Sequence, residues 1–325
     1  MRIGVIGGGA WGTALAQTAA AGGEVLLWAR SGDVVAAINH GHENPAYLPG
    51  VALSPAITAT ADIADMAACE AILAVTPAQH LRSVIARLPG GTAPLILCAK
   101  GIEAGTRLLM SEVAAEIRGH APIAVLSGPS FAHEVAAGQP TALTLACDDD
   151  AVGARLAARL ARPAFRLYRS SDVVGAEIGG AVKNVLAIAC GVVEGMALGQ
   201  NARAALISRG FAEMTRFGIA RGARVETLVG LSGLGDLVLT CSSMRSRNFS
   251  LGVGLGQGAR AADLLADRRT VAEGAYTAPV LLAAAAAAGV EMPIVTAVCA
   301  LIEGAADVRE VVGTLLARPL RAGED

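Results

Sequence analysis

The sequence predicts an α/β protein in two parts, a doubly wound parallel β-sheet followed by an all-helical half. In the first half, short and nearly continuous apolar runs alternate with helical stretches, which is typical of parallel strands buried on both faces. After Tyr168, strand-like runs become rare, and long alanine- and leucine-rich segments at helical spacing follow. A length of 325 residues suits two domains. We expect these domains to span 1–175 and 176–325.

The elements can be predicted in order along the chain. Residues 2–7 form an apolar run that ends in glycines, which indicates a buried strand. Small helix-forming residues over 10–21 predict a helix that stops at Gly22-Gly23. A second strand is expected at 25–28, a helical stretch near 34–40 and a loop over about 41–56. Further strands are expected at Ala71–Val75, Leu95–Ala99, Ile123–Ser127 and Leu143–Ala146, and helices within 175–198, 202–221, 278–288 and 293–305.

Composition excludes several classes of protein. With 54% apolar residues and a net charge of −2, neither a disordered chain nor the basic surface of a nucleic-acid-binding protein is expected. The alanine-rich run Val280–Val290 is far shorter than the ~20 residues that cross a bilayer, and no targeting signal is evident at the start. The cysteines are scattered without a C-x-x-C pair, which argues against disulfides and a metal site. We therefore expect a cytoplasmic protein with no membrane segment, metal or nucleic-acid partner.

The basic residues are almost all arginines. Of 26 Lys and Arg residues, only Lys100 and Lys183 are lysines. Burial can shift the pKa of a lysine into the range of proton transfer, whereas arginine stays charged. All histidines precede residue 134, so a proton-transfer residue in the second half is not a histidine. Both lysines are candidate functional residues, although two lysines can also remain by chance.

A glycine motif predicts a nucleotide cofactor. Gly7, Gly9 and Gly12 follow the first expected strand and open the first expected helix. This G-x-G-x-x-G spacing permits a tight turn, close approach of a pyrophosphate, and close packing of the helix on the strand, as in Rossmann-like domains. Arg30 stands near the end of the second strand, where NAD-specific proteins carry an acidic residue. The sequence thus favours NADP(H), and Asp33 leaves NAD(H) open.

Short strings along nearly the whole chain point to one family. They are GGGAWGTAL from Gly7, KGIE from Lys100, SGPSFA from Ser127, GGAVKNV from Gly179, GLGDL from Gly233, SRN from Ser246 and VAEG from Val271. Their order and spacing resemble the bacterial type of NAD(P)-dependent glycerol-3-phosphate dehydrogenase. The chain departs from the common family pattern at Ala10, where serine is frequent, and at Ala99, where serine or threonine is usual.

The resemblance implies the reversible reduction of dihydroxyacetone phosphate to sn-glycerol 3-phosphate by NADP(H) or NAD(H), which supplies glycerophospholipid synthesis. It implies that Lys183 is the proton donor and acceptor. The substrate-binding residues that it implies are Lys100, Gly128, Ser130, Lys183, Asp236, Ser246, Arg247 and Asn248. Beyond the motif glycines Gly7, Gly9 and Gly12, the cofactor contacts that it implies are Trp11, Arg30, Lys100, Ala132, Arg247, Val271 and Glu273. A homodimer is expected because it is the commonest assembly of such enzymes.

Physical chemistry agrees with the implied acid but leaves alternatives open. Lys183 lies in an apolar helical segment, where loss of hydration lowers a lysine pKa, although a surface lysine can also snorkel to water. Asp236 is expected in a glycine-rich loop, where it binds a substrate hydroxyl, stabilises the lysine or forms a turn. Ser246–Asn248 offers donors that suit a phosphate dianion, or is simply a polar loop. Two other functions remain: a dehydrogenase of hydroxy acids, and a non-catalytic NAD(P) sensor.

Overall fold

The computed structural model describes residues 1–266 and 272–317. Its internal contacts divide the chain into two compact units. The sheet unit comprises Met1–Ala99 and Leu109–Ala176, and the helical unit comprises Lys100–Leu108 and the chain from Glu177 onward. The helical unit therefore takes a short segment from the first half of the sequence, directly after a strand of the sheet.

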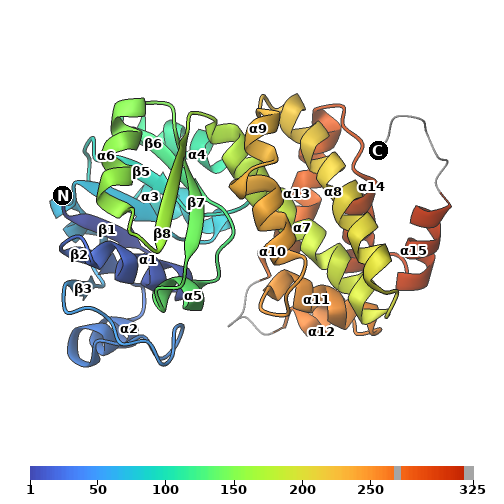
Figure 1. Ribbon diagram of the computed structural model, residues 1–325, viewed down its shortest axis with the longest axis horizontal. Coiled ribbons are helices and arrows are strands. Elements are labelled where there is room, and N and C mark those ends of the chain that lie inside the picture. The colour runs from blue at the N-terminus through green and yellow to red at the C-terminus, as the bar shows by residue number, and fades with distance from the viewer. Residues whose placement is uncertain (267–271, 318–325) are drawn as a thin grey trace. The chain divides into compact units, whose positions relative to one another are not determined.

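The sheet unit is built on one eight-stranded sheet in the order β3-β2-β1-β4-β5-β6-β7-β8 (Figure 1). The chain runs from β1 outward to β3, and then from β4 outward in the other direction. The order thus reverses between β1 and β4, the position at which such sheets bind ligands. The strands are β1 Ile3–Ile6, β2 Val25–Trp28, β3 Ile57–Thr60, β4 Ala71–Ala74, β5 Leu95–Leu97, β6 Ile123–Ser127, β7 Thr141–Cys147 and β8 Phe165–Ser170.

Helices connect these strands. All four residues of β1, of β2 and of β4 are buried, as a sheet covered on both faces requires. The helical elements are α1 Ala10–Ala20, α2 Gly32–Ala36, η1 Ala37–Gly41, η2 Ile63–Ala68, η3 Ala78–His80, α3 Leu81–Ile85, α4 Met110–Arg118, α5 Ala132–Ala136 and α6 Asp150–Leu160. The doubly wound α/β class predicted from the sequence is confirmed.

The sheet differs from the sequence prediction in two respects. Strand β7 runs antiparallel to β6, so the sheet is mostly rather than wholly parallel. The direction of a strand depends on its connection, here residues 128–140 with only the short helix α5, and an apolar run does not encode it. Strands β3 and β8 were not predicted, because their residues alternate between buried and exposed or are mostly exposed and form no continuous apolar run.

The helical unit surrounds one long helix, α7. The helices are α7 Val173–Gly195, α8 Gln200–Ala220, α9 Val225–Leu228, η4 Leu231–Gly235, α10 Asp236–Thr240, α11 Arg247–Gly256, α12 Ala261–Leu264, α13 Glu273–Ala287, α14 Pro293–Glu303 and α15 Val308–Leu316. Helices α7 and α11 touch backbone to backbone, since a Cβ on Gly191 would lie 2.1 Å from the Phe249 oxygen and one on Gly252 2.0 Å from the Ile188 oxygen.

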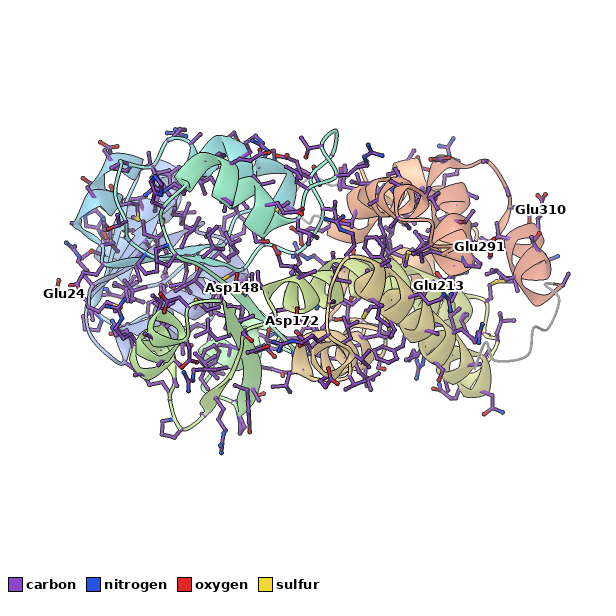
Figure 2. All side chains as sticks on the ribbon, turned by 90° about the horizontal axis from the view of Figure 1, so that it is seen from above. Glu24, Asp148, Asp172, Glu213, Glu291 and Glu310 are labelled. Carbon is purple, nitrogen blue, oxygen red and sulfur yellow. The ribbon has the colours of Figure 1, made fainter. Side chains whose placement is uncertain are left out.

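Buried charge also fixes the helices of this unit. Glu213 of α8, among the helices in Figure 2, is 3% exposed and accepts hydrogen bonds from the amides of Ile294 and Val295 at 2.8 and 3.4 Å. A carboxylate there compensates the positive end of α14.

Helix α7 is the one helix in the described ranges that is long and apolar enough to cross a membrane. In its most apolar window, 94% of the residues are buried inside the protein. It also carries the buried charged residues Glu177 and Lys183. These features are typical of the core helix of a globular unit.

Candidate active site

The glycine motif forms a tight turn between β1 and α1. Gly7 has a φ of +123°, and a Cβ at this position would lie 2.6 Å from the carbonyl oxygen of Val75. A Cβ on Gly12 would lie 1.9 Å from the oxygen of Gly7, so the first turn of α1 can lie this close to Gly7 only because residue 12 is a glycine. Gly9, by contrast, caps α1 with extended backbone and faces open space. Its open side lies at the helix N-terminus, where amide groups and the helix dipole favour an anion.

Asn44 holds this turn in place and was missed at the sequence level. Its Nδ2 group donates hydrogen bonds to the Gly8 carbonyl at 2.9 Å and to the Thr13 hydroxyl at 2.8 Å, and the residue is 1% exposed. The sequence predicts only that Asn44 lies in the loop over about 41–56. No local pattern singles out an asparagine whose contacts lie more than 30 residues away along the chain.

The carboxyl end of the sheet fits a dinucleotide. The buried hydroxyls of Thr76, after β4, and of Ser127, at the end of β6, have no hydrogen-bond partner among the residues described. Unpaired buried hydroxyls are costly and are expected where a polar ligand supplies the partner. Other candidate residues of this unit lie after strands or at helix starts: Trp11 in the first turn of α1, Arg30 exposed after β2, Gly128 with φ +147° and Ser130 after β6, and Ala132 at the start of α5.

A lysine–aspartate cluster lies inside the helical unit. The Lys183 ammonium of α7 lies 2.5 Å from Asp236 Oδ1, and the Lys100 ammonium lies 2.7 Å from Asp236 Oδ2. Lys183 also donates a hydrogen bond to the hydroxyl of Thr240 at 3.1 Å. Asp236 is fully buried and Lys183 is 6% exposed, which excludes a snorkelling lysine. One carboxylate therefore bridges the only two lysines of the chain.

The cluster gives the two lysines different proton affinities. Desolvation lowers the pKa of Lys183 to about 7, with Asp236 opposing this shift and the Lys100 charge adding to it. For Lys100, desolvation acts in the same direction, but the Asp236 carboxylate, with a smaller contribution from Glu273, outweighs it and raises the pKa. At neutral pH, Lys100 is therefore charged while Lys183 exchanges its proton readily, as a general acid–base group must.

The structure corrects the expectation that Asp236 and Ser246–Asn248 lie in loops. Asp236 begins α10 directly after the short π-helix η4, and Ser246 is the N-cap of α11, accepting from the Phe249 amide at 3.2 Å. The backbone amides of Arg247 and Asn248 in the first turn of α11 have no acceptor among the described residues, and no acidic residue occurs in that turn. Arg247 is exposed and Asn248 is buried.

Two further polar residues belong to this unit's site, and one candidate cannot be placed. The Thr240 hydroxyl contacts both Lys183 and Asp236, accepting from Nζ at 3.1 Å and donating to Asp236 Oδ1 at 3.4 Å. Asn184, adjacent to Lys183, is 6% exposed, and its carboxamide makes no hydrogen bond with the described residues. Glu273 is the first residue of α13, whereas Val271 lies outside the described residues. The string GGAVKNV contains Asn184, and Thr240 lies three residues after the string GLGDL, but only burial and, for Thr240, its hydrogen bonds single them out.

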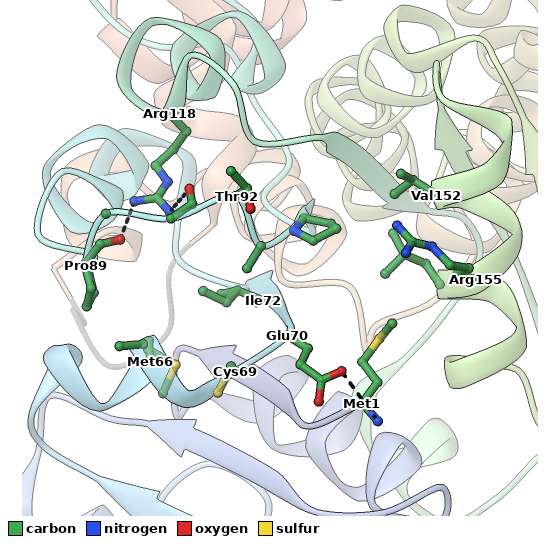
Figure 3. A pocket seen from close by; sticks show the side chains of 16 residues that line it. Met1, Met66, Cys69, Glu70, Ile72, Pro89, Thr92, Arg118, Val152 and Arg155 are labelled. Atoms are coloured by element: carbon green, nitrogen blue, oxygen red, sulfur yellow. Dashed lines mark hydrogen bonds and ion pairs between the residues drawn. The ribbon is translucent and has the colours of Figure 1, made fainter.

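A separate cavity of about 450 Å³ lies at the opposite edge of the sheet (Figure 3). Met1, Glu70 and Pro94 line it just before β1, β4 and β5, and Arg118 donates to the carbonyls of Pro89 and Gly91 at its rim. It is distinct from the glycine turn, which follows β1. No group of three or more metal-ligating side chains occurs within residues 1–266 and 272–317.

The glycine turn and the mostly parallel sheet define a Rossmann-type, NAD(P)-binding oxidoreductase with a helical second unit. Models of the NAD-dependent glycerol-3-phosphate dehydrogenase family match both parts of the chain, the N-terminal model over residues 2–153 and the C-terminal model over residues 172–313. The chain belongs to this family.

Individual relatives agree over nearly the whole length. Glycerol-3-phosphate dehydrogenase (NAD(P)+) 1 of Sphingopyxis alaskensis is 61% identical over 98% of this chain and 97% of its own length. The enzyme of the same name from Novosphingobium aromaticivorans is 64% identical over 99% and 98%. The crystal structure of glycerol-3-phosphate dehydrogenase from Coxiella burnetii superposes with a TM-score of 0.93 at 39% identity, covering 98% of this chain and 99% of that one.

Proposed function

We propose that this chain catalyses the reversible NAD(P)H-dependent reduction of dihydroxyacetone phosphate to sn-glycerol 3-phosphate, with Lys183 as proton donor and acceptor. The observation that carries the assignment of the acid is the buried Lys183 amine, whose pKa lies at about 7 beside Asp236 and Lys100. Family membership and the names of the relatives support the substrate.

Lys183 supplies the proton that the reaction needs. When bound, the nicotinamide cofactor supplies the hydride for the carbonyl carbon, and the oxygen that becomes an alkoxide requires a proton. The Lys183 ammonium donates that proton from Nζ, and the neutral amine accepts it in the reverse direction. Asp236 stabilises the ammonium and Thr240 orients Nζ through its hydroxyl. Lys100, whose pKa is raised by Asp236, carries a positive charge that stabilises developing negative charge on the oxygen.

The first turn of α11 is the proposed phosphate site. It offers the amides of Arg247 and Asn248, which have no acceptor among the described residues, together with the Arg247 guanidinium, in a turn without acidic residues. A phosphate dianion is favoured at such a helix N-terminus and is held well by the forked donors of arginine. We further propose that Gly128, Ser130 and Ser246 contact the substrate.

The proposed cofactor site uses Gly7, Gly9, Gly12 and Trp11 for the pyrophosphate end, and Arg30 for a ribose 2′-phosphate. The exposed position of Arg30 after β2 supports NADP(H) as the preferred form, with NAD(H) as an alternative. Ala132, Glu273 and Val271 complete the proposed contacts, and Val271 rests on the sequence alone. In this scheme residues 1–175 supply most of the cofactor contacts and 176–325 most of the substrate contacts. The exceptions are Lys100, Gly128 and Ser130 for the substrate and Arg247, Val271 and Glu273 for the cofactor. We further propose that the protein is a cytoplasmic homodimer and that its product supplies glycerophospholipid synthesis.

The test is oxidation of NADPH followed at 340 nm with dihydroxyacetone phosphate, repeated with NADH, with unphosphorylated dihydroxyacetone and with a panel of 2-keto acids. We expect turnover that depends on the phosphate group and is faster with NADPH. Turnover of a keto acid instead would assign a hydroxy-acid dehydrogenase. Cofactor binding without turnover of any substrate would indicate a sensor.

A further inference from the structure

The start of α13 is attached to the start of α11 by one hydrogen bond. The backbone amide of Gly274, the second residue of α13, donates to Oδ1 of Asn248 at 2.9 Å. Helix α13 has no side-chain cap of its own, so this carboxamide, from a residue 26 positions earlier, serves as its N-cap.

This bond determines which way the Asn248 carboxamide faces. A backbone N–H can be satisfied only by the oxygen of the amide, so Oδ1 must face Gly274 and Nδ2 must face the other side. Asn248 is 8% exposed, and Nδ2 makes no hydrogen bond with the described residues, although it is not sealed from solvent. With Oδ1 fixed on the Gly274 amide, the two N–H donors of Nδ2 face away from that contact and can donate to a bound acceptor.

Residue 274 has to be a glycine for this contact to form. A Cβ at this position would lie 2.5 Å from the carbonyl oxygen of Asn184 and 2.9 Å from Asn248 Oδ1. The carbonyl belongs to the backbone of α7, one residue after Lys183, and cannot move without moving the helix. Even a methyl group would therefore push the start of α13 away from Asn248 and break the cap.

We propose that Gly274 is a positioning residue for the substrate: its amide orients Asn248 so that Nδ2 donates to the phosphate group of the substrate. Through the same cap, Asn248 holds Glu273, the first residue of α13, so the phosphate site and the proposed cofactor contact share one anchor. This inference rests on the proposed function, because it takes the phosphorylated substrate from there.

The most specific test separates the capping role of Asn248 Oδ1 from the donor role of Asn248 Nδ2. In Asn248→Asp, a carboxylate of the same shape still accepts from Gly274 and suits a helix N-terminus, but it donates nothing and repels a phosphate. We expect an unchanged or higher Tm and a KM for dihydroxyacetone phosphate raised about 50-fold or more. The activity ratio between dihydroxyacetone phosphate and dihydroxyacetone should fall in parallel. A merely structural asparagine would not change this ratio, so an unchanged ratio overturns the proposal.

The second variant addresses Gly274 itself. Gly274→Ala should raise the KM for dihydroxyacetone phosphate about 10-fold and lower that same ratio, because Nδ2 is no longer held in place. Gly313→Ala in α15 is the matched control: this helical glycine has nothing within 4 Å of its Cβ position, and we expect wild-type kinetics. A folded Gly274→Ala enzyme with wild-type KM overturns the positioning role.

The activity of the wild-type enzyme distinguishes a failure of the proposed function from a failure of the inference about Asn248 and Gly274. If the wild type does not reduce dihydroxyacetone phosphate, the proposed function is wrong. If it does while Asn248→Asp keeps its KM, only the inference about Asn248 and Gly274 is wrong. Should Gly274→Ala fail to fold, Asn248→Asp still tests donation by Nδ2, and an unchanged KM there overturns the proposal because Gly274 then has no donor to position.

Discussion

The candidate cofactor turn of the sheet unit and the candidate proton-transfer cluster of the helical unit are formed by different chemical groups. The turn consists of backbone: Gly7 and Gly12 are constrained by carbonyl oxygens, and Gly9 leaves a space open. The cluster consists of charged side chains, with Lys183 and Lys100 sharing one buried carboxylate. The first should therefore respond to volume and be nearly indifferent to pH, whereas the second should respond to charge and protonation.

The largest expected effect is that of removing the acid. Lys183→Met keeps the apolar volume in α7 but has no proton to give, so kcat should fall about 10²–10⁴-fold. NADPH affinity, measured by fluorescence titration, should stay within about twofold because the turn lies in the other unit. A kcat within tenfold of wild type would show that another group supplies the proton.

A single methyl group added to the turn should weaken NADPH binding and leave kcat nearly unchanged. Gly9→Ala is compatible with the extended backbone at this position and meets no atom within 4 Å, so the fold should be unaffected. Its Cβ would occupy the space where a pyrophosphate approaches, and we expect the Kd for NADPH to rise about 30-fold with kcat little changed. Gly90→Ala, another glycine with open space, is the control in the same unit. Unaltered NADPH binding in Gly9→Ala would remove the turn from the cofactor site.

Arg30 tests whether the sheet unit also uses charge. Arg30→Ala should raise the KM for NADPH about 10-fold and leave the KM for NADH within about twofold, because only NADPH carries the 2′-phosphate. Steady-state kinetics with both cofactors give the ratio directly. An equal change for both would mean that Arg30 does not read the 2′-phosphate.

The smallest effects are shifts in pH dependence, but their signs are opposite. With the pKa of Lys183 at about 7, kcat for ketone reduction should fall as pH rises through 7, since the ammonium is the donor, and kcat for the reverse oxidation should rise. Asp236→Asn removes a charge that raises this pKa and should move both limbs to lower pH. Lys100→Met removes a charge that lowers the pKa and should move them to higher pH. Profiles recorded at saturating substrate would contradict the cluster if both variants shifted in the same direction.

The sequence predicted the turn in detail because its determinants are local. Gly12 is fixed by a contact with Gly7 inside the turn, and Gly7 has a positive φ; both requirements are visible as a spacing, although Gly7 also meets the carbonyl of Val75, just after β4. The buried strands were likewise visible as apolar runs. Strand β3 and the direction of β7 were not, since they depend on pairing with other strands.

The cluster was only partly predictable because its geometry is not local. The rarity of lysine and the family strings drew attention to Lys100 and Lys183. Their shared partner is 136 residues from Lys100, and no pattern within the sequence shows that Asp236 is fully buried. The glycines around Asp236 indicated a loop, whereas the chain forms a short π-helix and an α-helix there. Asn44 escaped notice for the same reason.

The segment Lys100–Leu108, which belongs to the helical unit although both of its flanks belong to the sheet unit, limits how the protein can be dissected. A truncated fragment that begins at Glu177 would lack Lys100, leaving Lys183 as the one cation among the described residues that pairs with the buried Asp236. A chimera made by a single crossover near residue 176 would combine the lysine of one parent with the aspartate of another. Recombination between relatives should therefore exchange residues 100–108 together with the C-terminal half.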